Sequence, residues 1–310
     1  MSGGGTSPGL ASIHVYPLKG GRAIDLDESA VEPWGLAGDR RWLVADDAGR
    51  FVSQREEPAL ARVIVRYAPV LPAPLPGDEA PADRITGAEA PADRAPGASP
   101  LPTGFITLSA AGHPSLDVRA PSAGPAAEMI DVTVWRSKVS ATAAGPDADG
   151  WLSRLLDRPV RLVYLDDPTR REVDPQYGTP SDRVSFADGF PLLLTTAGSL
   201  EELNRWLAED GDPPVPMNRF RPNVVAEGTA PWAEDRWRRI RIGTVTFRVA
   251  KPCGRCQVTT IDQTTGQRGR QPLKMLGRRR RFGQALVFGQ NMIPDAPGII
   301  RVGDRIRVLE

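Results

Sequence analysis

The chain has 310 residues, of which 40% are hydrophobic, so it is long enough for one large or two modest domains with a substantial core. Its 39 basic and 38 acidic residues leave a net charge of +1, which excludes a general electrostatic attraction to nucleic acid or membranes. Two cysteines are too few for a disulfide-stabilised secreted scaffold. The Gly/Ser-rich N-terminus does not resemble a signal peptide, and no stretch approaches the roughly 20 apolar residues of a membrane span. We therefore expect a cytoplasmic protein.

The first predicted strand covers residues 10–17, in which Ile13 and Val15 alternate with other residues. Lys19 and Gly20 then begin a glycine-rich turn. Glycines after a strand let backbone N–H groups approach an anion, and the lysine adds positive charge. These residues alone favour a simple hairpin turn with a solvated lysine, and an anion site is the alternative.

Two further strands are predicted at residues 24–31 and 41–45, and Arg40 and Arg41 stand at the start of the second. Successive side chains of a strand point to opposite faces, so one of the two arginines is expected to point inward. A surface arginine paired with Asp39 is the alternative interpretation.

Residues 68–104 are rich in Pro, Ala, Gly and Asp, and the sequence Ala-Pro-Ala-Asp-Arg occurs there twice. Such a composition cannot bury enough apolar surface to offset the entropy of the chain, so a disordered insertion is expected. Strands resume at residues 105–108, and an alternating strand over 129–135 ends the first predicted domain, residues 10–136.

A second domain is predicted over residues 150–310. It begins with a short helix that Pro159 ends, followed by a strand over 160–165 and a polar, Pro-rich segment over 166–181 that is expected to be a mobile loop. Ser199 begins a Ser-x-x-Glu capping box, so it is predicted to be the N-cap of a helix.

A stiff polar loop surrounds a proline, with Arg221 before it and Asn223 after it. The residue before a proline is disfavoured in a helix, so Arg221 is expected to be extended or in a turn. Arginine is suited to bidentate recognition of phosphate. A loop arginine whose hydrogen bonds are satisfied within the protein is an equally good interpretation of these residues alone.

Both cysteines of the chain, Cys253 and Cys256, lie in the sequence KPCGRC at residues 251–256. The neighbouring lysine and arginine favour the thiolate, because nearby cations lower the pKa of a thiol. Proline and glycine predict a turn, and the β-branched residues within 257–261 predict a strand after it. The thiol would then stand on a stiff loop at the start of a strand.

Four interpretations fit such a cysteine pair. A zinc site requires four ligands, and only His14 and His113 remain as soft candidates. A thioredoxin-like redox pair should open a helix, whereas a strand is predicted here. Two ordinary buried cysteines are a third interpretation. In the fourth, one thiolate binds a soft transition metal whose other ligands belong to a cofactor.

The remaining elements indicate the fold class. Many short strands, few helices and repeated Gly/Pro turns predict a mainly β, barrel-like protein, and the alternation over residues 298–309 is typical of a barrel-closing strand. Four arginines at residues 278–281 could bind nucleic acid. A solvated surface is the favoured interpretation, because no aromatic residues alternate with the arginines.

The segment KPCGRCQVTTID with the following Thr265-Gly266 resembles the molybdenum-binding signature of MOSC-domain proteins. Residues 15–20, 38–44 and 220–225 match the same subgroup in the same order and with similar spacing. This subgroup includes the mitochondrial amidoxime-reducing component and bacterial relatives that reduce N-hydroxylated bases. The resemblance implies an N-terminal β-barrel-like domain packed on a MOSC β-barrel, with molybdopterin-bound molybdenum between them.

The resemblance also implies roles for individual residues. Cys256, the second cysteine, is the expected molybdenum ligand and catalytic residue, and Cys253 is expected to be structural or to lie next to the metal ligand. Relatives have serine in place of Gly20 and hydroxyl residues in place of Gly189 and Phe190, so this chain offers only backbone groups there. The residues expected to contact the cofactor are Lys19, Gly20, Arg40, Gly189, Phe190, Arg221, Asn223, Gly254 and Arg255.

The implied activity is reduction of hydroxylamines, amidoximes and N-hydroxylated bases by removal of their oxygen at molybdenum. The alternative is a module that carries or transfers the cofactor or sulfur without turnover. Two cysteines cannot hold the four-cysteine iron–sulfur cluster of some bacterial relatives, so a separate flavin or iron–sulfur protein is the expected electron donor. Pyridoxal phosphate is not expected as a cofactor, nor nucleic acid or a membrane as a partner.

Overall fold

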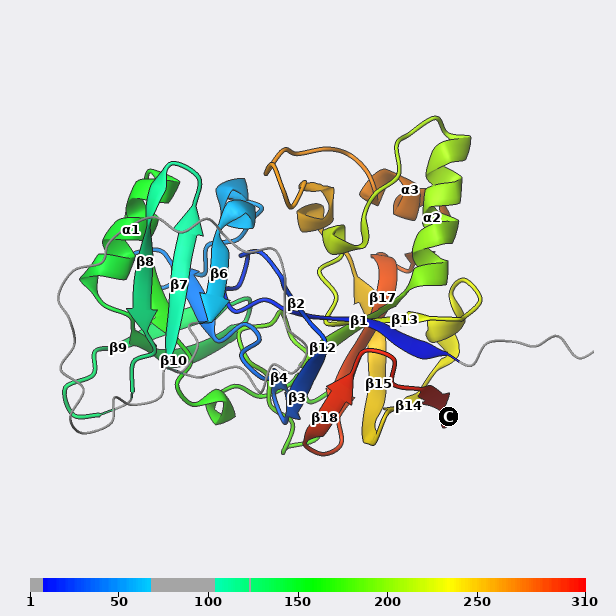
Figure 1. Ribbon diagram of the computed structural model, residues 1–310, viewed down its shortest axis with the longest axis horizontal. Coiled ribbons are helices and arrows are strands. Elements are labelled where there is room, and N and C mark those ends of the chain that lie inside the picture. Colours follow the sequence, from blue (N-terminus) through cyan, green and yellow to red (C-terminus); the bar gives the residue numbers. More distant parts are fainter. Residues whose placement is uncertain (1–7, 68–103, 123) are drawn as a thin grey trace, which may run out of the picture.

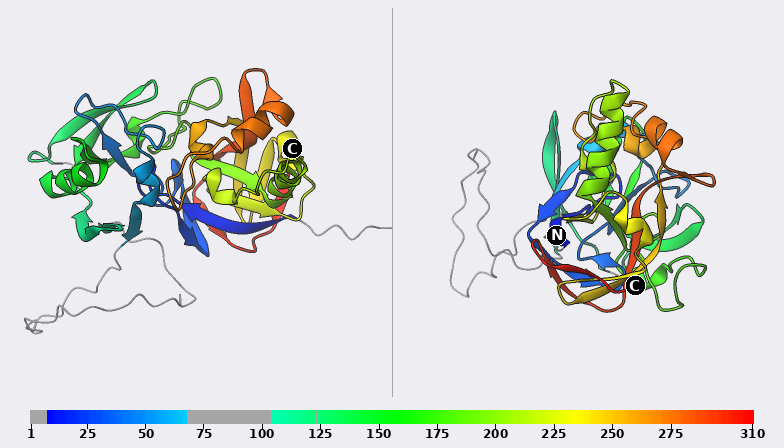
Figure 2. Two further views of the ribbon diagram at one scale, coloured as in Figure 1. Left: turned by 90° about the horizontal axis from the view of Figure 1, so that it is seen from above. Right: turned by 90° about the vertical axis from the view of Figure 1, so that its right-hand side faces the viewer.

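The computed structural model describes residues 8–67, 104–122 and 124–310. All but the last residue of the predicted insertion at 68–104 lies outside the described residues. Within the described ranges the chain is mainly β with three α-helices, which confirms the predicted fold class. None of these helices is long and apolar enough to cross a membrane. The strands form two lobes that lie side by side (Figures 1 and 2).

The first lobe contains two antiparallel sheets. One sheet consists, in spatial order, of β5 (Trp42–Ala45), β11 (Arg161–Tyr164), β10 (Ser137–Ala143) and β9 (Met129–Val134), and the other of β6 (Ile64–Tyr67), β7 (Phe105–Ala110) and β8 (His113–Arg119).

Helix α1 (Pro146–Leu156) packs on this lobe through Trp151 and Leu152, which are both buried. The helix ends at Leu156, because the next residue, Asp157, has a left-handed backbone conformation. The helix therefore stops three residues before Pro159, which was predicted to end it.

The second lobe is built on a nine-stranded sheet. Its strands, in spatial order, are β19 (Ile306–Val308), β14 (Arg239–Ile242), β15 (Val245–Gly254), β17 (Ala285–Pro294), β12 (Leu192–Thr196), β13 (Val224–Glu227), β1 (Gly9–Val15) and β2 (Ile24–Leu26), with β16 (Arg281–Phe282) paired to β17. A small sheet beside it contains β18 (Gly298–Arg301), β3 (Glu28–Glu32) and β4 (Gly35–Leu36).

Hydrogen bonds join the two ends of the described chain. Leu10 donates its N–H to the carbonyl of Asp304 at 2.9 Å, and its own carbonyl accepts from Gly303 at 2.8 Å. Ile306 donates to the carbonyl of Pro8 at 2.8 Å. These bonds bring the start of β1 against the segment that leads into β19, so the path of strands closes on itself.

The predicted closing strand over residues 298–309 is in fact two strands. β18 pairs with β3 and β19 pairs with β14, and the turn between them forms the seam with β1. Ile300 and Ile306 are buried, but Val302, in the turn, and Val308, at the end of β19, are more than 40% exposed.

The predicted division into residues 10–136 and 150–310 does not coincide with the distribution of strands between the sheets. β1 and β2 belong to the large sheet of the second lobe, whereas β11 pairs with β5 and β10 in the first lobe. The physical reason is hydrophobic burial. Leu10 and Ile13 are fully buried in one cluster with Val224 and Phe247, which come from the other end of the chain.

Helices α2 (Ala197–Glu209) and α3 (Leu273–Arg279) contribute to one hydrophobic cluster at the edge of the second lobe (Figure 1). The N-cap of α2 is Thr196 and not Ser199 as predicted, since the Thr196 side chain accepts the N–H of Ser199 at 3.2 Å. The hydroxyl of Ser199 instead donates to the buried carboxylate of Glu234 at 2.7 Å.

Short 3₁₀ helices connect several strands. They are η1 (Pro58–Arg62), η2 (Pro168–Arg170), η3 (Met217–Arg219), η4 (Ala233–Arg236) and η5 (Gln257–Thr260).

The four consecutive arginines form a solvated surface only in part. Arg280 is 7% exposed, and its guanidinium donates to Asp235 at 2.7 Å. Arg278 and Arg279 pair with Asp210 and Glu209 at the end of α2. Acidic partners therefore neutralise much of this basic run.

Leu10 tests the closure of the large sheet. We expect Leu10→Ala to lower the free energy of unfolding by about 2–5 kcal/mol, because it deletes a fully buried side chain from the strand that closes the sheet. Leu309→Ala is the matched control, since Leu309 is 46% exposed and its truncation should change stability by less than about 0.5 kcal/mol. Equal denaturation midpoints for the two variants would contradict this account.

Candidate functional site

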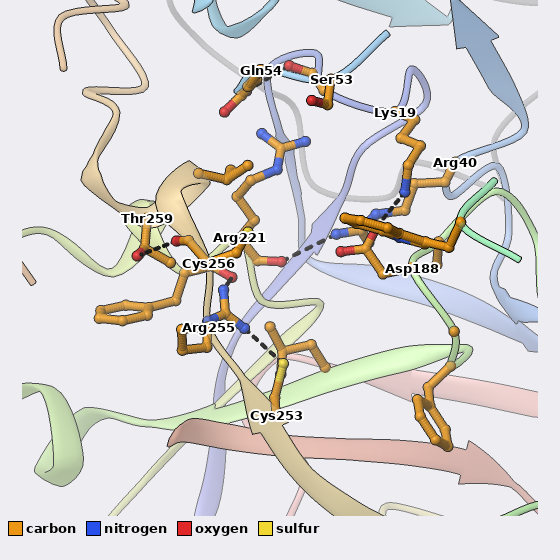
Figure 3. Close-up of a pocket in the computed structure, with 18 of the residues that line it drawn as sticks. Lys19, Arg40, Ser53, Gln54, Asp188, Arg221, Cys253, Arg255, Cys256 and Thr259 are labelled. Atoms are coloured by element: carbon orange, nitrogen blue, oxygen red, sulfur yellow. Dashed lines mark hydrogen bonds and ion pairs between the residues drawn. The ribbon is translucent and has the colours of Figure 1, made fainter. Parts of the chain in front are cut away.

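A cavity of about 140 Å³ lies between the two lobes (Figure 3). All the residues that the sequence predicted for the site line it: Lys19, Gly20, Arg40, Gly189, Phe190, Arg221, Asn223, Gly254, Arg255 and Cys256. The structure thus brings together residues from both ends of the chain. Their contact with a cofactor remains a prediction.

The cysteine segment has a different secondary structure from the predicted one. β15 ends at Gly254, and the residues after Cys256 form the 3₁₀ helix η5 and not a strand. The β-branched side chains that predicted a strand serve this turn, because the hydroxyls of Thr259 and Thr260 donate to backbone carbonyls at 2.9 and 2.8 Å. Cys256 therefore follows the end of β15, and it lines the cavity.

The two thiols have different surroundings. Nη1 of Arg255 donates to Sγ of Cys253 at 2.9 Å, and Nη2 donates to the carbonyl of Phe220 at 2.6 Å. Among the described residues, no hydrogen bond involves the Sγ of Cys256. Cys253 therefore helps to hold Arg255 in place, whereas the thiol of Cys256 is available to a ligand.

The other interpretations of the cysteine pair receive no support from the surroundings. Both cysteines are free thiols, and no group of three or more His, Cys, Asp or Glu within the described ranges could hold a metal ion. A closed zinc site needs four such ligands. β15 is antiparallel to both β14 and β17, so the cysteines do not stand in the βαβ unit of a thioredoxin-like motif.

Tyr16 lies between two guanidinium groups. The Cζ atoms of Arg40 and Arg221 are 4.3 and 4.2 Å from the centre of its ring. Asp39, which is 1% exposed, accepts the N–H of Tyr16 at 2.8 Å and Nη1 of Arg40 at 2.6 Å. Arg40 is thus paired with Asp39, as the alternative interpretation held, but in the interior and not on the surface.

Asn223 positions other groups. Its Oδ1 accepts from Arg40 at 3.0 Å and from the N–H of Leu193 at 3.2 Å, and its Nδ2 donates to the carbonyl of His14 at 3.1 Å. The side chain is 1% exposed. Asn223 therefore ties Arg40 to the large sheet, and only part of its hydrogen-bonding capacity is left for a ligand.

Arg221 carries a charge that its protein surroundings leave unbalanced. It is 9% exposed, its Nη1 donates to the amide oxygen of Gln263 at 3.0 Å, and no carboxylate of the described residues forms an ion pair with it. Burial lowers the pKa of Arg221 to about 10, although Tyr16 acts in the opposite direction. For Arg40, burial acts to lower the pKa, but the charge and hydrogen bond of Asp39 together with Tyr16 and Asp188 raise it. An anion in the cavity would therefore stabilise the charge of Arg221 more than that of Arg40.

Lys19 and Asp188 form an ion pair in the cavity wall. Nζ of Lys19 lies 2.5 Å from Oδ1 of Asp188, and Nε1 of Trp135 donates to the same oxygen at 3.1 Å. Burial lowers the pKa of Lys19, and Asp188 opposes this only in part. Enclosure by the cavity wall acts to raise the pKa of Asp188, but Lys19, Trp135 and Arg40 together lower it. The Asp188 side chain remains 72% exposed, so its carboxylate is accessible.

Sequence reasoning missed Asp188, which lines the cavity, and Arg171, which supports the segment that carries it. Asp188 directly precedes the predicted Gly189, and that proximity was the available signal. Arg171 lies in the segment expected to be a mobile loop, yet it is 3% exposed and donates to the carbonyls of Ser185, Ala187 and Asp188. This buried cation holds the segment that carries Asp188, and burial lowers its pKa to about 10.

The turn after Lys19 is held by a pair of glutamines. Gly20 has a left-handed φ of +88°, and its carbonyl accepts from Nε2 of Gln54 at 2.6 Å. Gln54 and Gln263 exchange two amide hydrogen bonds of 3.0 Å, so the turn is linked to Arg221 through Gln263. Ser53, which precedes Gln54, is 8% exposed, and its Oγ has no partner among the described residues.

Gly189 and Phe190 contribute differently to the wall. A Cβ at Gly189 would meet no atom within 4 Å, so the cavity wall has open space at this position. The Phe190 ring contacts Tyr177 edge-on, with 6.0 Å between ring centres, and Lys251 Nζ lies 4.2 Å from the centre of the Tyr177 ring.

Residues 7–159 match the MOSC N-terminal beta barrel domain, and residues 181–307 match the MOSC domain. The chain belongs to the MOSC-domain proteins. It is 29% identical to mitochondrial amidoxime-reducing component 1 of Mus musculus, over 97% of this chain and 82% of that protein. The human protein of the same name is 27% identical over the same shares. Molybdenum cofactor sulfurase of Bos taurus is 25% identical over 96% of this chain, but only 32% of its own length.

These relatives connect this MOSC-domain protein with molybdenum-cofactor chemistry, and the cavity fits such a group. Among the described lining residues, Lys19, Arg40, Arg55, Arg221 and Arg255 are cationic and only Asp188 is anionic. Ser53 Oγ and Arg255 Nε are buried polar atoms without a partner in the described chain. A phosphate-bearing cofactor would balance the excess positive charge, and it would offer acceptors to both atoms.

The pKa of Tyr16 gives a test of this arrangement. Burial raises it to about 12, against about 10 in an unfolded chain. The folded state therefore retains a proton that the unfolded state loses between these values, so stability falls as the pH rises through that interval. Tyr16→Phe lacks this titration, and also the hydrogen bond from the hydroxyl to the carbonyl of Pro222 at 3.1 Å.

We expect the stability advantage of the wild type over Tyr16→Phe to shrink as the pH rises from about 10 to about 12. Denaturant unfolding at a series of pH values measures it. Because the other titrating groups are common to both proteins, the difference isolates Tyr16. A difference that stays constant over this range would show that Tyr16 ionises normally.

Proposed function

We propose that this protein is a molybdenum-cofactor-dependent reductase of N-hydroxylated compounds such as hydroxylamines, amidoximes and N-hydroxylated bases. One observation supports this above all. Within the described residues the thiol of Cys256 makes no hydrogen bond, and it lines a cavity with a large excess of positive charge. A soft metal with an anionic organic carrier needs both of these features.

Different residues of the cavity would hold the metal and the phosphate of the cofactor. Cys256 would supply a thiolate to molybdenum, since soft sulfur ligands suit this metal. Arg221 and Arg255 are the best phosphate partners, because Arg40 and Lys19 already have carboxylate partners. When bound, the cofactor supplies the two-electron chemistry that removes oxygen from an N–OH group.

The side chains of the protein would supply the ionisable and hydrogen-bonding groups for the reaction. Reduction of an N–OH group to N–H with release of water consumes two protons for two electrons. Lys19 and Asp188 form an ionisable pair at the cavity, and the exposed carboxylate of Asp188 can accept hydrogen bonds from the N–H and O–H groups of a substrate. Lys19 holds that carboxylate through their 2.5 Å contact, and the indole N–H of Trp135 adds a hydrogen bond to the same oxygen.

The activity is tested with benzamidoxime and a chemical electron donor, after expression in a host that makes the cofactor. We expect turnover by the wild type, and loss of turnover to background in Cys256→Ala. Cys253→Ala is the matched control and should retain most of its molybdenum, because Cys253 faces Arg255. Wild-type protein that contains stoichiometric molybdenum but reduces no N-hydroxylated compound would exclude this function.

The molybdenum content tests the role of Arg221 separately. We expect Arg221→Gln to lower the molybdenum bound per chain about 10- to 100-fold at limiting cofactor, because it removes the unbalanced cation. Arg219→Gln is a close control, as Arg219 pairs with Asp262 at 3.1 Å and does not line the cavity. Equal metal contents by elemental analysis in both variants would show that Arg221 does not hold the cofactor.

Electrons would come from a separate flavin or iron–sulfur protein. The two cysteines of the chain are too few for a four-cysteine cluster, which supports this part of the proposal. Reduction of a hydroxylamine by the purified protein with NADH alone would contradict it.

A carrier or transfer module for the cofactor or for sulfur is the second candidate. The similarity to molybdenum cofactor sulfurase over 96% of this chain favours it. Such a module would bind molybdenum through the same cavity but show no turnover with any N-hydroxylated compound, so the benzamidoxime assay separates the two functions.

A further inference from the structure

Trp135 is a large aromatic residue at the cavity with an unusual degree of exposure. It lines the cavity and yet remains 45% exposed. Tryptophan in a purely structural role buries most of its ring, since burial is the source of its stabilising effect. The ring of Trp135 therefore calls for an explanation beyond packing.

The backbone at Trp135 is also unfavourable for this side chain. Residues 135 and 136 form the two-residue turn between β9 and β10, and Trp135 has a φ of +58°. Arg136, the second turn residue, is not among the residues with positive φ. Turns with a positive φ at the first position favour glycine there, because a Cβ is sterically unfavourable. Strain of this kind is typical of functional positions.

Three contacts fix the orientation of the ring. The guanidinium of Arg55 lies over it at 4.4 Å, and Phe51 contacts it edge-on with 5.2 Å between ring centres. Its Nε1 donates to Oδ1 of Asp188 at 3.1 Å. The ring is thus held rigidly by residues of the first lobe, and its hydrogen bond reaches the segment that leads into β12. A ring fixed in this way is a preorganised stacking surface.

The position beside Asp188 suits an uncharged substrate better than the anionic cofactor. The carboxylate repels a phosphate, whereas it accepts hydrogen bonds from N–H and O–H groups. Figure 3 shows Lys19 and Asp188 on one side of the cavity, and Cys256 and Arg255 on the opposite side. A planar molecule stacked on Trp135 would have its polar end at Asp188, and it would lie between the two sides.

We propose that Trp135 is a specificity-determining residue that selects planar, conjugated N-hydroxylated compounds over aliphatic ones by stacking on their ring. This inference rests on the proposed reductase function and names the substrate class within it. Aromatic stacking adds to the affinity for a ring, whereas the hydrogen bonds of Asp188 serve aromatic and aliphatic amidoximes equally.

The test compares benzamidoxime with acetamidoxime, which carries the same functional group without a ring, under a chemical electron donor. We expect Trp135→Ala to raise KM for benzamidoxime about 5- to 10-fold, with kcat changed less than about 2-fold, and to leave KM for acetamidoxime within about 2-fold. Trp135→Phe should restore most of the affinity for benzamidoxime. Phe282→Ala, an equally exposed aromatic residue outside the cavity wall, should change neither substrate.

A binding measurement provides a readout without turnover. Isothermal titration of the oxidised, cofactor-loaded protein with each amidoxime should show the same preference for the ring, and Trp135→Ala should abolish that preference. Equal losses of affinity for both compounds in Trp135→Ala would show that Trp135 only supports the fold, and they would overturn this inference. If the loaded wild type reduces neither compound, the reductase function fails. The titration still decides the role of Trp135, because ring-dependent binding that requires Trp135 supports it and its absence refutes it.

Discussion

Two guanidinium groups lie against the ring of Tyr16, and among the described residues only Asp39 forms an ion pair with one of them. Like charges in a poorly solvated interior repel each other, so this arrangement persists only because neighbouring groups hold it. Asn223 and the carbonyl of residue 221 bind Arg40, and Gln263 binds Arg221. Segments from both ends of the chain must therefore come together before either arginine is satisfied. The position of the cavity between the lobes follows from this constraint.

Backbone strain accompanies the charge. Arg40 and Arg221 both have left-handed φ angles, of 46° and 54°, which are uncommon for residues with a side chain. The two arginines of the Tyr16 cluster thus combine unfavourable backbone with unfavourable charge. Selection for stability alone would remove both features, whereas a site that must attract an anionic ligand retains them. The charge and the strained backbone of these two arginines thus lower the stability of the fold and also provide the capacity to bind an anion.

The sequence predicted much of the cavity because its residues lie in four compact motifs. Lys19, Arg40, Arg221 and Cys256 could be found by motif, since motif spacing reflects the strands that carry them. Asp188, Trp135 and Arg171 lie outside these motifs, and no local pattern encodes their ion pair and hydrogen bonds, whose partners are 14 to 169 residues away. Asp188 lies 169 residues from Lys19.

The errors in local structure have physical causes as well. The β-branched residues after Cys256 favoured a strand, but hydroxyl–backbone hydrogen bonds stabilise a 3₁₀ helix there. Ser199 matched a capping box, yet Thr196 precedes it by three residues and caps the helix instead. Strands near the predicted domain boundary are shared between the lobes, because β1 buries Leu10 and Ile13 in the second lobe and β11 buries Leu162 and Val163 in the first.

The hydrogen bonds of Pro8 and Leu10 with residues 303–306 also have a consequence for biosynthesis. β1 is synthesised long before residues 303–306, its partners at this seam. Until these partners are made, the edge of β1 near Leu10 is unpaired, and unpaired strand edges promote aggregation. Contacts of such long sequence separation also slow folding. The large sheet can therefore close only after residues 303–306 have been made, and the open edge of β1 is a surface that chaperones would shield until then.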